Sequence, residues 1–500
     1  MEIGFENKVV NTYREISHQV KRIQESAESV VPDINDDIGR IASIQTSVQL
    51  KSKDLSSRGV TVTGEASAVL LYITEGDSAV SSVRVTKTFT MDYEIGDIEA
   101  DVVSQINLQV TNAEARVLNP RKVSVTLELA GELSCYRPEA MNVETLIPEG
   151  GCAGLHAKFE ETEAIIANAV CEKTFAINEQ YSFPGGKPVP SQLVSQNVDF
   201  CISEKQHIGS KIIIKGTVDI SVCYLSNEVN YPLSVNFSSP FSQIIDTGEE
   251  DMDNCTALIE LTSAFYEMIE TINGEKAMDA ELHAVVQIVS RCRRAVRYIS
   301  DAYSNAMPAK CSVQTSQINT VSDVLRAKLS SDERINIADD CNDVLSVFAS
   351  ISQIASADGR LSASVSLDVF YRTKDGGLSA AKRQMNLEGE CIEAPSRIIK
   401  ARLSDIYLRP DGAAIDSHLS VEISYQSCTN MELSRVTAVS LDEENIYDQT
   451  AFPTVTLVRT DSESIWELAK RYHSSTEGIG ALNNLEDGIS GKLLLVPKEI

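Results

Sequence analysis

The chain has 500 residues, which is too long for a single hydrophobic core and indicates roughly three or four domains. Apolar residues make up 43% of it, a normal share for a globular protein, which excludes disorder as the default state. The formal net charge of −28 argues against nucleic acid and anionic lipid as partners.

The N-terminal residues predict no export. The segment from Met1 to Glu6 has no basic start followed by an apolar run, and no stretch of the chain approaches the roughly 18 apolar residues of a membrane span. Eleven cysteines occur without any C-x-x-C pair, which argues against a zinc knuckle or a thioredoxin-type motif. We therefore expect a cytoplasmic protein with reduced thiols and no direct membrane insertion.

The first predicted element is an amphipathic helix over residues 9–23. Apolar side chains recur there at helical spacing, namely Val9, Tyr13, Ile16, Val20 and Ile23. Two roles are open for it: packing on the first β domain, or docking to a partner.

One alternating strand occurs three times along the first 440 residues. Its apolar positions share one parity over 60–72, again over 212–224 and again over 361–371, which predicts a half-buried β-strand in each copy. Each copy ends in a tyrosine (Tyr72, Tyr224, Tyr371), and eight positions earlier each has a small residue (Gly64, Gly216, Ala363). The tyrosines lie about 150 residues apart.

A hairpin signal follows each of these strands. The turns are Asn119-Pro120, Asn273-Gly274 and Pro410-Asp411-Gly412, each between two alternating runs. We infer a mainly β protein with three tandem repeats of about 150 residues, each a sandwich or barrel-like pair of sheets. The predicted boundaries are 1–150 (with the N-terminal helix), 151–305 and 306–440.

A different pattern follows an acidic, polar linker predicted at 441–452. In the module predicted at 453–500, Ser464 and Glu467 form a capping box at the start of a helix. A second short helix over 475–482 and flanking strands at 455–458 and 493–496 give the order β-α-α-β. We expect this module to hang on its linker, so that a protease cuts first near 441–452 and releases it.

The helix from Ser462 to Tyr472, with Ala481-Leu482-Asn483 and the run from Gly491 to Pro497, resembles the LysM domain. LysM domains bind N-acetylglucosamine glycans such as peptidoglycan or chitin. The resemblance implies a groove between two loops, made of Ser462, Glu463, Ser464, Ile465, Asn484, Leu485, Glu486, Asp487, Gly488 and Ile489. Ser462-Glu463 replaces the usual Gly-Asp. The lone tryptophan, Trp466, is expected to be a core residue.

The three repeats resemble the SPOCS domains of spore-forming bacteria, which commonly precede a C-terminal LysM domain. Val31-Pro32-Asp33, the Gly-to-Tyr strand and the recurrent hairpin carry this resemblance. It implies a setting in the mother-cell cytoplasm, at the forespore surface or spore coat. It also implies that the LysM module can engage a coat protein, a coat-basement ATPase, instead of glycan, and both ligand classes stay open.

No catalytic constellation is recognisable in the sequence, and we expect no cofactor, no metal site and no enzyme activity. The six histidines are scattered without a metal-binding pair, and the run from Phe183 to Pro188 lacks the pattern of a phosphate loop. Three functions remain open: a structural adaptor of the spore coat or envelope, a general cell-wall glycan binder unrelated to sporulation, and an enzyme with an unseen site. Self-association through the β repeats is a further expectation. Within the module, we expect a protein to bind at least as well as glycan.

Overall fold

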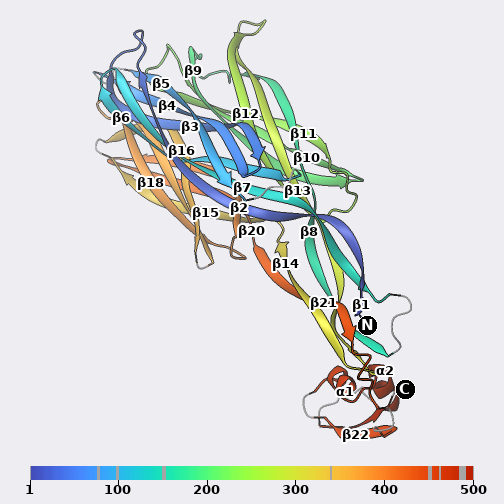
Figure 1. The fold of residues 1–500 in the computed structure, drawn as a ribbon. Coiled ribbons are helices and arrows are strands. Elements are labelled where there is room, and N and C mark those ends of the chain that lie inside the picture. The colour runs from blue at the N-terminus through green and yellow to red at the C-terminus, as the bar shows by residue number, and fades with distance from the viewer. Residues whose placement is uncertain are drawn as a thin grey trace.

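The computed structural model describes residues 2–75, 79–96, 101–148, 154–337, 340–357, 359–448, 453–460, 463–483 and 491–498. Strands dominate this part of the chain, and two short helices occur near the C-terminus, which confirms the mainly β prediction. Figure 1 shows a broad head, a narrower stalk below it, and a small module at the far end of the stalk.

Each repeat contains a three-stranded antiparallel sheet whose middle strand is the alternating strand predicted from the sequence. The side chains that share the predicted parity are buried on the sandwich side of this strand. The strands are β3 (Ile38–Ser56), β4 (Gly59–Thr74) and β5 (Val80–Glu94); β9 (Gln192–Ile208), β10 (Lys211–Leu225) and β11 (Leu233–Asp246); β16 (Cys341–Ala357), β17 (Arg360–Thr373) and β18 (Leu378–Glu390).

A second layer faces the first sheet in each repeat and contains the predicted hairpin, and in the first two repeats these layers join in one six-stranded sheet. In each case the last strand of the repeat pairs with both the hairpin's other arm and the strand that opens the repeat. The strands are β2 (Glu6–Val30), β6 (Val103–Asn119) and β7 (Lys122–Leu146); β8 (Leu155–Ser182), β12 (Asn254–Glu270) and β13 (Lys276–Ser304); β15 (Leu325–Asn336), β19 (Arg397–Asp411) and β20 (Ala414–Gln426). The two sheets enclose one apolar core per repeat.

The small residue of the recurrent strand makes room for an aromatic ring. Gly64 lies opposite Phe89 of the neighbouring strand, and a Cβ at Gly64 would stand 2.3 Å from the Phe89 ring. Gly216 lies opposite Phe241, but a Cβ there would stand closest to the Cys201 carbonyl oxygen of β9, at 2.1 Å, and 3.0 Å from the Phe241 ring. In the third repeat Ala363 faces Leu387, where a smaller partner leaves room for a methyl group.

The N-terminal helix prediction is wrong. Residues 9–23 lie within the 25-residue strand β2, which pairs with β7 along almost its whole length. β2 has register shifts after Lys8 and Glu15. At each shift the side chains that point to a given face change from odd to even positions or the reverse, so the apolar residues fall at irregular, helix-like intervals. Val9 and Val20 are more than half exposed, as strand residues of a face that meets solvent.

The stalk is built from strands that run beyond the sandwiches. β2, β7, β8 and β13 are 25 to 29 residues long, well above the usual strand length. In the third repeat the corresponding path is split, so that a separate sheet is formed by β1 (Glu2–Gly4), β14 (Ala309–Val321) and β21 (Cys428–Leu441). Apolar side chains of β13 and β21, such as Ile299 and Val439, form a core inside the stalk.

The C-terminal module has the predicted β-α-α-β order. It consists of β22 (Val455–Arg459), α1 (Ile465–Arg471), α2 (Thr476–Leu482) and β23 (Leu493–Pro497). The capping box of Ser464 and Glu467 is present at the start of α1. Leu468, Ile479 and Leu494 are among the side chains that form its core.

The described cysteines, ten in number, are all free thiols, while Cys152 lies outside the described residues. No helix in the described part of the chain is long and apolar enough to cross a membrane.

Candidate functional site

The predicted loop site is only partly placed by the structure. Ser462 and residues 484–489 lie outside the described residues, so the groove between the two loops is not described. Glu463, Ser464 and Ile465 are described and lie together at the start of α1.

These three residues are engaged within the module. The Glu463 carboxylate forms an ion pair with Arg471 at the other end of α1. The Ser464 amide donates to Glu467 Oε2 at 2.7 Å, and this bond, with a second one from the Ser464 hydroxyl, lowers the pKa of Glu467. Ile465 is half-buried against the module core. The described part of the loop therefore forms the capped N-terminus of α1, with the acidic side chain of Glu463 just before it.

The module docks on the end of β13, a contact that sequence reasoning did not foresee. Tyr303 is 4% exposed, and the Trp466 ring meets it edge-on with 4.9 Å between ring centroids. The Tyr303 hydroxyl donates to the Ser474 carbonyl oxygen at 2.7 Å. Trp466 is thus a packing residue, as expected, but it packs on the stalk as well as within the module.

Asp301 of β13 supplies the negative charge in this contact between the stalk and the module. Its carboxylate accepts a hydrogen bond from the Trp466 indole at 2.8 Å and pairs with the Lys470 ammonium at 2.7 Å. Burial alone would raise the pKa of Asp301, but the hydrogen bonds from Lys470 and Trp466 outweigh burial and lower it.

The predicted linker also follows the stalk. The Asp442 amide donates to the Pro308 carbonyl at 3.0 Å, and the Tyr447 amide donates to the Ala306 carbonyl at 2.9 Å. Residues 449–452 lie outside the described residues. Together with the docking of α1, these bonds replace the expected freely hanging module with one that is held against the tip of β13.

Substituting Asp301 with alanine is expected to loosen the module by about 1–2 kcal/mol, because the Lys470 ammonium and the Trp466 N–H both lose a charged acceptor. Limited proteolysis near residues 441–452 should become several-fold faster, and the fluorescence of the single tryptophan should shift to the red. The control is Glu161→Ala, which removes an exposed acid from β8 in the same stalk. Equal cleavage rates for both variants would contradict the role given to Asp301.

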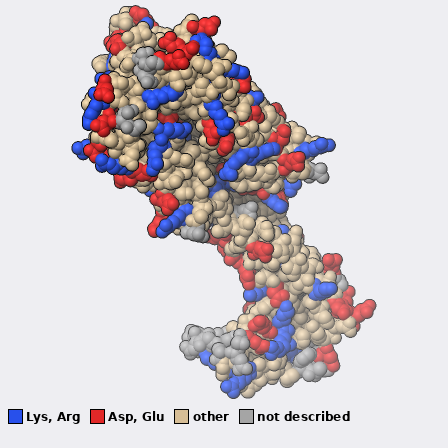
Figure 2. All heavy atoms as spheres, turned by 90° about the vertical axis from the view of Figure 1, so that its left-hand side faces the viewer, with Lys and Arg blue, Asp and Glu red and all other residues tan. Residues whose placement is uncertain are grey.

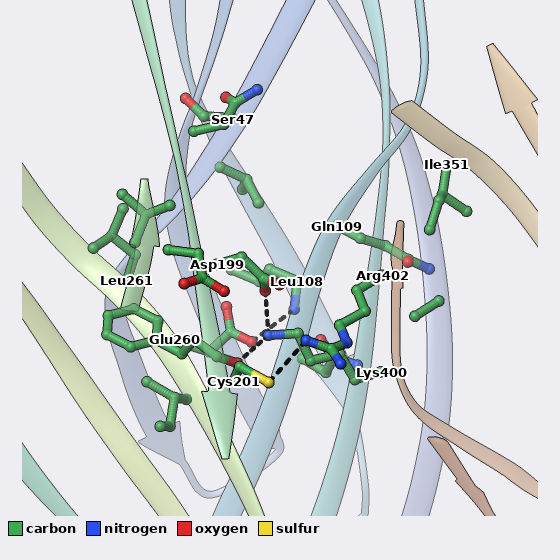
Figure 3. Close-up of a pocket in the computed structure, with 18 of the residues that line it drawn as sticks. Ser47, Leu108, Gln109, Asp199, Cys201, Glu260, Leu261, Ile351, Lys400 and Arg402 are labelled. Atoms are coloured by element: carbon green, nitrogen blue, oxygen red, sulfur yellow. Dashed lines mark hydrogen bonds and ion pairs between the residues drawn. The ribbon is translucent and has the colours of Figure 1, made fainter. Parts of the chain in front are cut away.

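A second candidate site is a cavity of about 1930 Å³ between the three repeats. Strands from every repeat line it, above all β3, β6, β9, β12, β16 and β19. Figure 3 shows side chains from several of these strands pointing toward one another across it.

Two cations on β19 join the third repeat to the second at this cavity. The Lys400 ammonium donates to the Phe200 carbonyl and pairs with Asp199. Arg402 donates to the Cys201 sulfur at 2.9 Å (Figure 3). It also donates to Glu422 Oε2 at 2.6 Å. These groups are satisfied by one another, so they hold strands together across the boundary between repeats.

Glu260 of β12 is the most unusual group of the cavity wall. Its side chain is 8% exposed, and its Oε1 accepts a hydrogen bond from the Leu108 amide of the first repeat at 3.4 Å. Burial raises the pKa of Glu260 to about 8, against the opposing effects of the Leu108 amide, Lys400 and Lys53. The group is therefore a buried proton-binding carboxyl at a boundary between repeats.

No group of three or more metal-ligating side chains is present in the described parts of the chain. The residues of the cavity wall pair opposite charges across repeats, and burial raises the pKa of the Glu260 carboxyl. Sequence reasoning missed this cavity, because residues such as Glu260 and Lys400 are far apart in the chain. The one sequence feature that could have indicated the site is a single carboxylate inside the apolar run Ala257-Leu258-Ile259-Glu260-Leu261.

On the face drawn in Figure 2, acidic and basic side chains are interspersed over the head and the stalk. The acidic excess of the chain is thus distributed and is not gathered there into one extended patch.

Comparison with known proteins finds one family model that matches parts of the chain. A family model described as SipL, SPOCS domain, matches residues 37–118 and 191–269. No curated protein and no solved structure matches the chain. The two matched ranges cover β3 to β6 and β9 to β12, which are the same four strands of the first and second repeats. Over these two ranges the chain is similar to the SPOCS domain, and this similarity points to a protein associated with sporulation.

Proposed function

We propose that this chain is a non-enzymatic structural adaptor of spore coat or spore envelope assembly. The observation that carries the proposal is the SPOCS match at the same four strands of two repeats. The third repeat, which the family match does not cover, has the same two-sheet plan over β15 to β20. Three sandwiches of one kind, joined by paired charges, can together support a terminal module.

In this proposal the C-terminal module is a LysM-type binding module. Its β-α-α-β order, the capping box of α1 and the resemblance of the sequence support this interpretation. The module binds a coat morphogenetic protein, and a peptidoglycan-type glycan is the alternative ligand. Docking on Asp301 and Tyr303 fixes the orientation of the module relative to the head, which suits an adaptor that joins two layers.

The test is to fuse the full-length chain to a fluorescent protein in its native host and follow it through the life cycle. We expect no signal in growing cells, appearance only during sporulation, and a ring around the forespore from the mother-cell side. Constant expression, or labelling of the vegetative cell wall, would contradict the adaptor and favour a general glycan-binding protein.

A second arm of this test separates the two ligand classes. Calorimetric titration of the full-length chain with chitin or peptidoglycan oligomers is expected to show weak or no heat. A pull-down from sporulating cell extract is expected to recover a coat protein. Micromolar glycan affinity with no protein recovered would show that the module is a sugar binder.

A further inference from the structure

The two-stranded sheet of the C-terminal module has one apolar face that no described residue covers. Its other face, with Val458, Leu494 and Val496, is buried against the helices. On the outward face, exposed fractions are 43% for Val455, 60% for Leu457, 63% for Leu493 and 39% for Leu495. We call this set of four side chains the outer sheet face.

The four side chains form one continuous surface. Leu457 lies directly opposite Leu495 in the antiparallel pairing, Arg459 lies opposite Leu493, and Val455 lies opposite Pro497. Side chains opposite or diagonal to one another on one face of such a pair are within contact distance. Scattered exposed aliphatic residues are ordinary, but a compact group on one small sheet marks an interaction surface.

The described residues of this sheet and of its strand ends carry only positive charge, in contrast to the chain as a whole. Residues 453–460 and 491–498 contain Arg459, Lys492 and Lys498 and no Asp or Glu, whereas the whole chain carries −28. Arg459 is exposed on the outward face itself. Within the described residues none of these three cations forms an ion pair. Arg459, which the strand pairing places on the outward face, can thus pair with an acidic group of a partner.

The size of the surface limits what can occupy it. Four half-exposed aliphatic side chains offer only a few hundred Å², whereas a stable dimer needs about 800 Å² per partner. A second copy bound through this face alone would therefore be unstable. A single amphipathic segment of another protein has the right size.

We propose that the outer sheet face binds an acidic amphipathic segment of a protein partner, with its apolar side chains on Leu457 and Leu495 and its carboxylates toward Arg459. This inference rests on the proposed adaptor function and deepens it, because it moves the partner site from the predicted loops to the sheet. The predicted loop residue Glu463 is acidic and already paired with Arg471, which suits an acidic partner poorly.

The experiment uses the full-length chain and four variants. Leu457→Ser/Leu495→Ser removes the apolar contact, and Arg459→Glu reverses the charge. Glu463→Ala alters the loop site, and Ile208→Ser is the matched control, because Ile208 is also 60% exposed but lies at the end of β9. Unchanged tryptophan fluorescence and unfolding temperature establish that each variant is folded.

Each protein is titrated with two synthetic amphipathic peptides that have identical leucine positions, one with glutamates and one with lysines. We expect the glutamate peptide to bind wild type, Ile208→Ser and Glu463→Ala alike. Binding should weaken about tenfold or more in the leucine double variant and in Arg459→Glu. Any binding of the lysine peptide, which the acidic chain as a whole attracts, should be the same for wild type and the leucine double variant. In pull-downs from sporulating extract, the protein that wild type retains should be lost from the same two variants.

Failure of the inference can be told apart from failure of the proposed function. If wild type retains a coat protein, and only Glu463→Ala loses it, the adaptor stands and the outer sheet face is refuted. Pelleting with phosphatidylglycerol vesicles that the leucine substitutions abolish would assign the face to a membrane. Dimerisation that they abolish would assign it to a second copy. If wild type retains no coat protein at all, the adaptor function itself fails.

Discussion

Replacing Arg397 with methionine is expected to lower the free energy of unfolding by about 3 kcal/mol, because carboxylates at the boundary between the third and first repeats lose their cation. The Arg397 side chain is 10% exposed, and its Nη2 lies 2.6 Å from Glu15 Oε1. The same guanidinium approaches Glu132 at 3.9 Å and donates to the Tyr136 hydroxyl at 3.4 Å. Burial raises the pKa of Glu132, and Arg397 opposes that rise.

Urea unfolding of the full-length chain measures this effect. The control is Arg409→Met on the same strand, β19, where the side chain is exposed and a change below about 0.5 kcal/mol is expected. The double variant Arg397→Met/Glu15→Gln should recover part of the loss, since it removes one of the carboxylates left without a partner. A loss no larger than that of the control would mean that Arg397 does not hold the repeats together.

The strands within each repeat could be predicted because their alternating pattern is local in the sequence. Alternation over 60–72 and its two copies gave the middle strand of each first sheet, and the three turn signals gave the hairpins. The sequence shows Gly64 and Gly216 only as a spacing, whereas the need for glycine comes from neighbouring strands: the Phe89 ring approaches Gly64, and the Cys201 carbonyl and the Phe241 ring approach Gly216. The third repeat was found from the same spacing with Ala363 in place of glycine.

The errors arise where distant segments decide the structure. Residues 9–23 have helical spacing, yet β7, more than 100 residues away, pairs with them and imposes a strand. The docking of Trp466 on Tyr303 and Asp301 involves elements 165 residues apart, which no local pattern reveals. The domain boundaries remain a prediction, and so do the seven loop residues outside the described parts of the chain.

The cavity between the repeats was unpredictable for the same reason. Its wall combines Asp199 and Glu260 of the second repeat with Lys400 of the third, and no local sequence pattern predicts that these residues come together. A sequence can show an isolated carboxylate within an apolar strand. Such a group is costly to bury, so it indicates a candidate functional site.

Glu260→Gln is expected to stabilise the protein at alkaline pH and to have little effect in acid. In the folded chain burial raises the pKa of Glu260 to about 8, above its ordinary value of 4.5. The folded state therefore holds this proton more tightly than the unfolded state. The stabilisation is complete below pH 4.5, declines as pH rises, and is lost above pH 8. A glutamine carries no charge at any pH and keeps an oxygen that accepts the Leu108 N–H.

Unfolding free energies measured from pH 4 to pH 9 should therefore diverge between the two proteins. The difference in favour of Glu260→Gln should grow between these limits and reach on the order of 4 kcal/mol at pH 9. Glu267→Gln, an exposed change on the same strand, should run parallel to wild type at every pH. Parallel curves for Glu260→Gln as well would mean that Glu260 titrates normally. The carboxyl would then be solvated, and the boundary between the first and second repeats would be open to water.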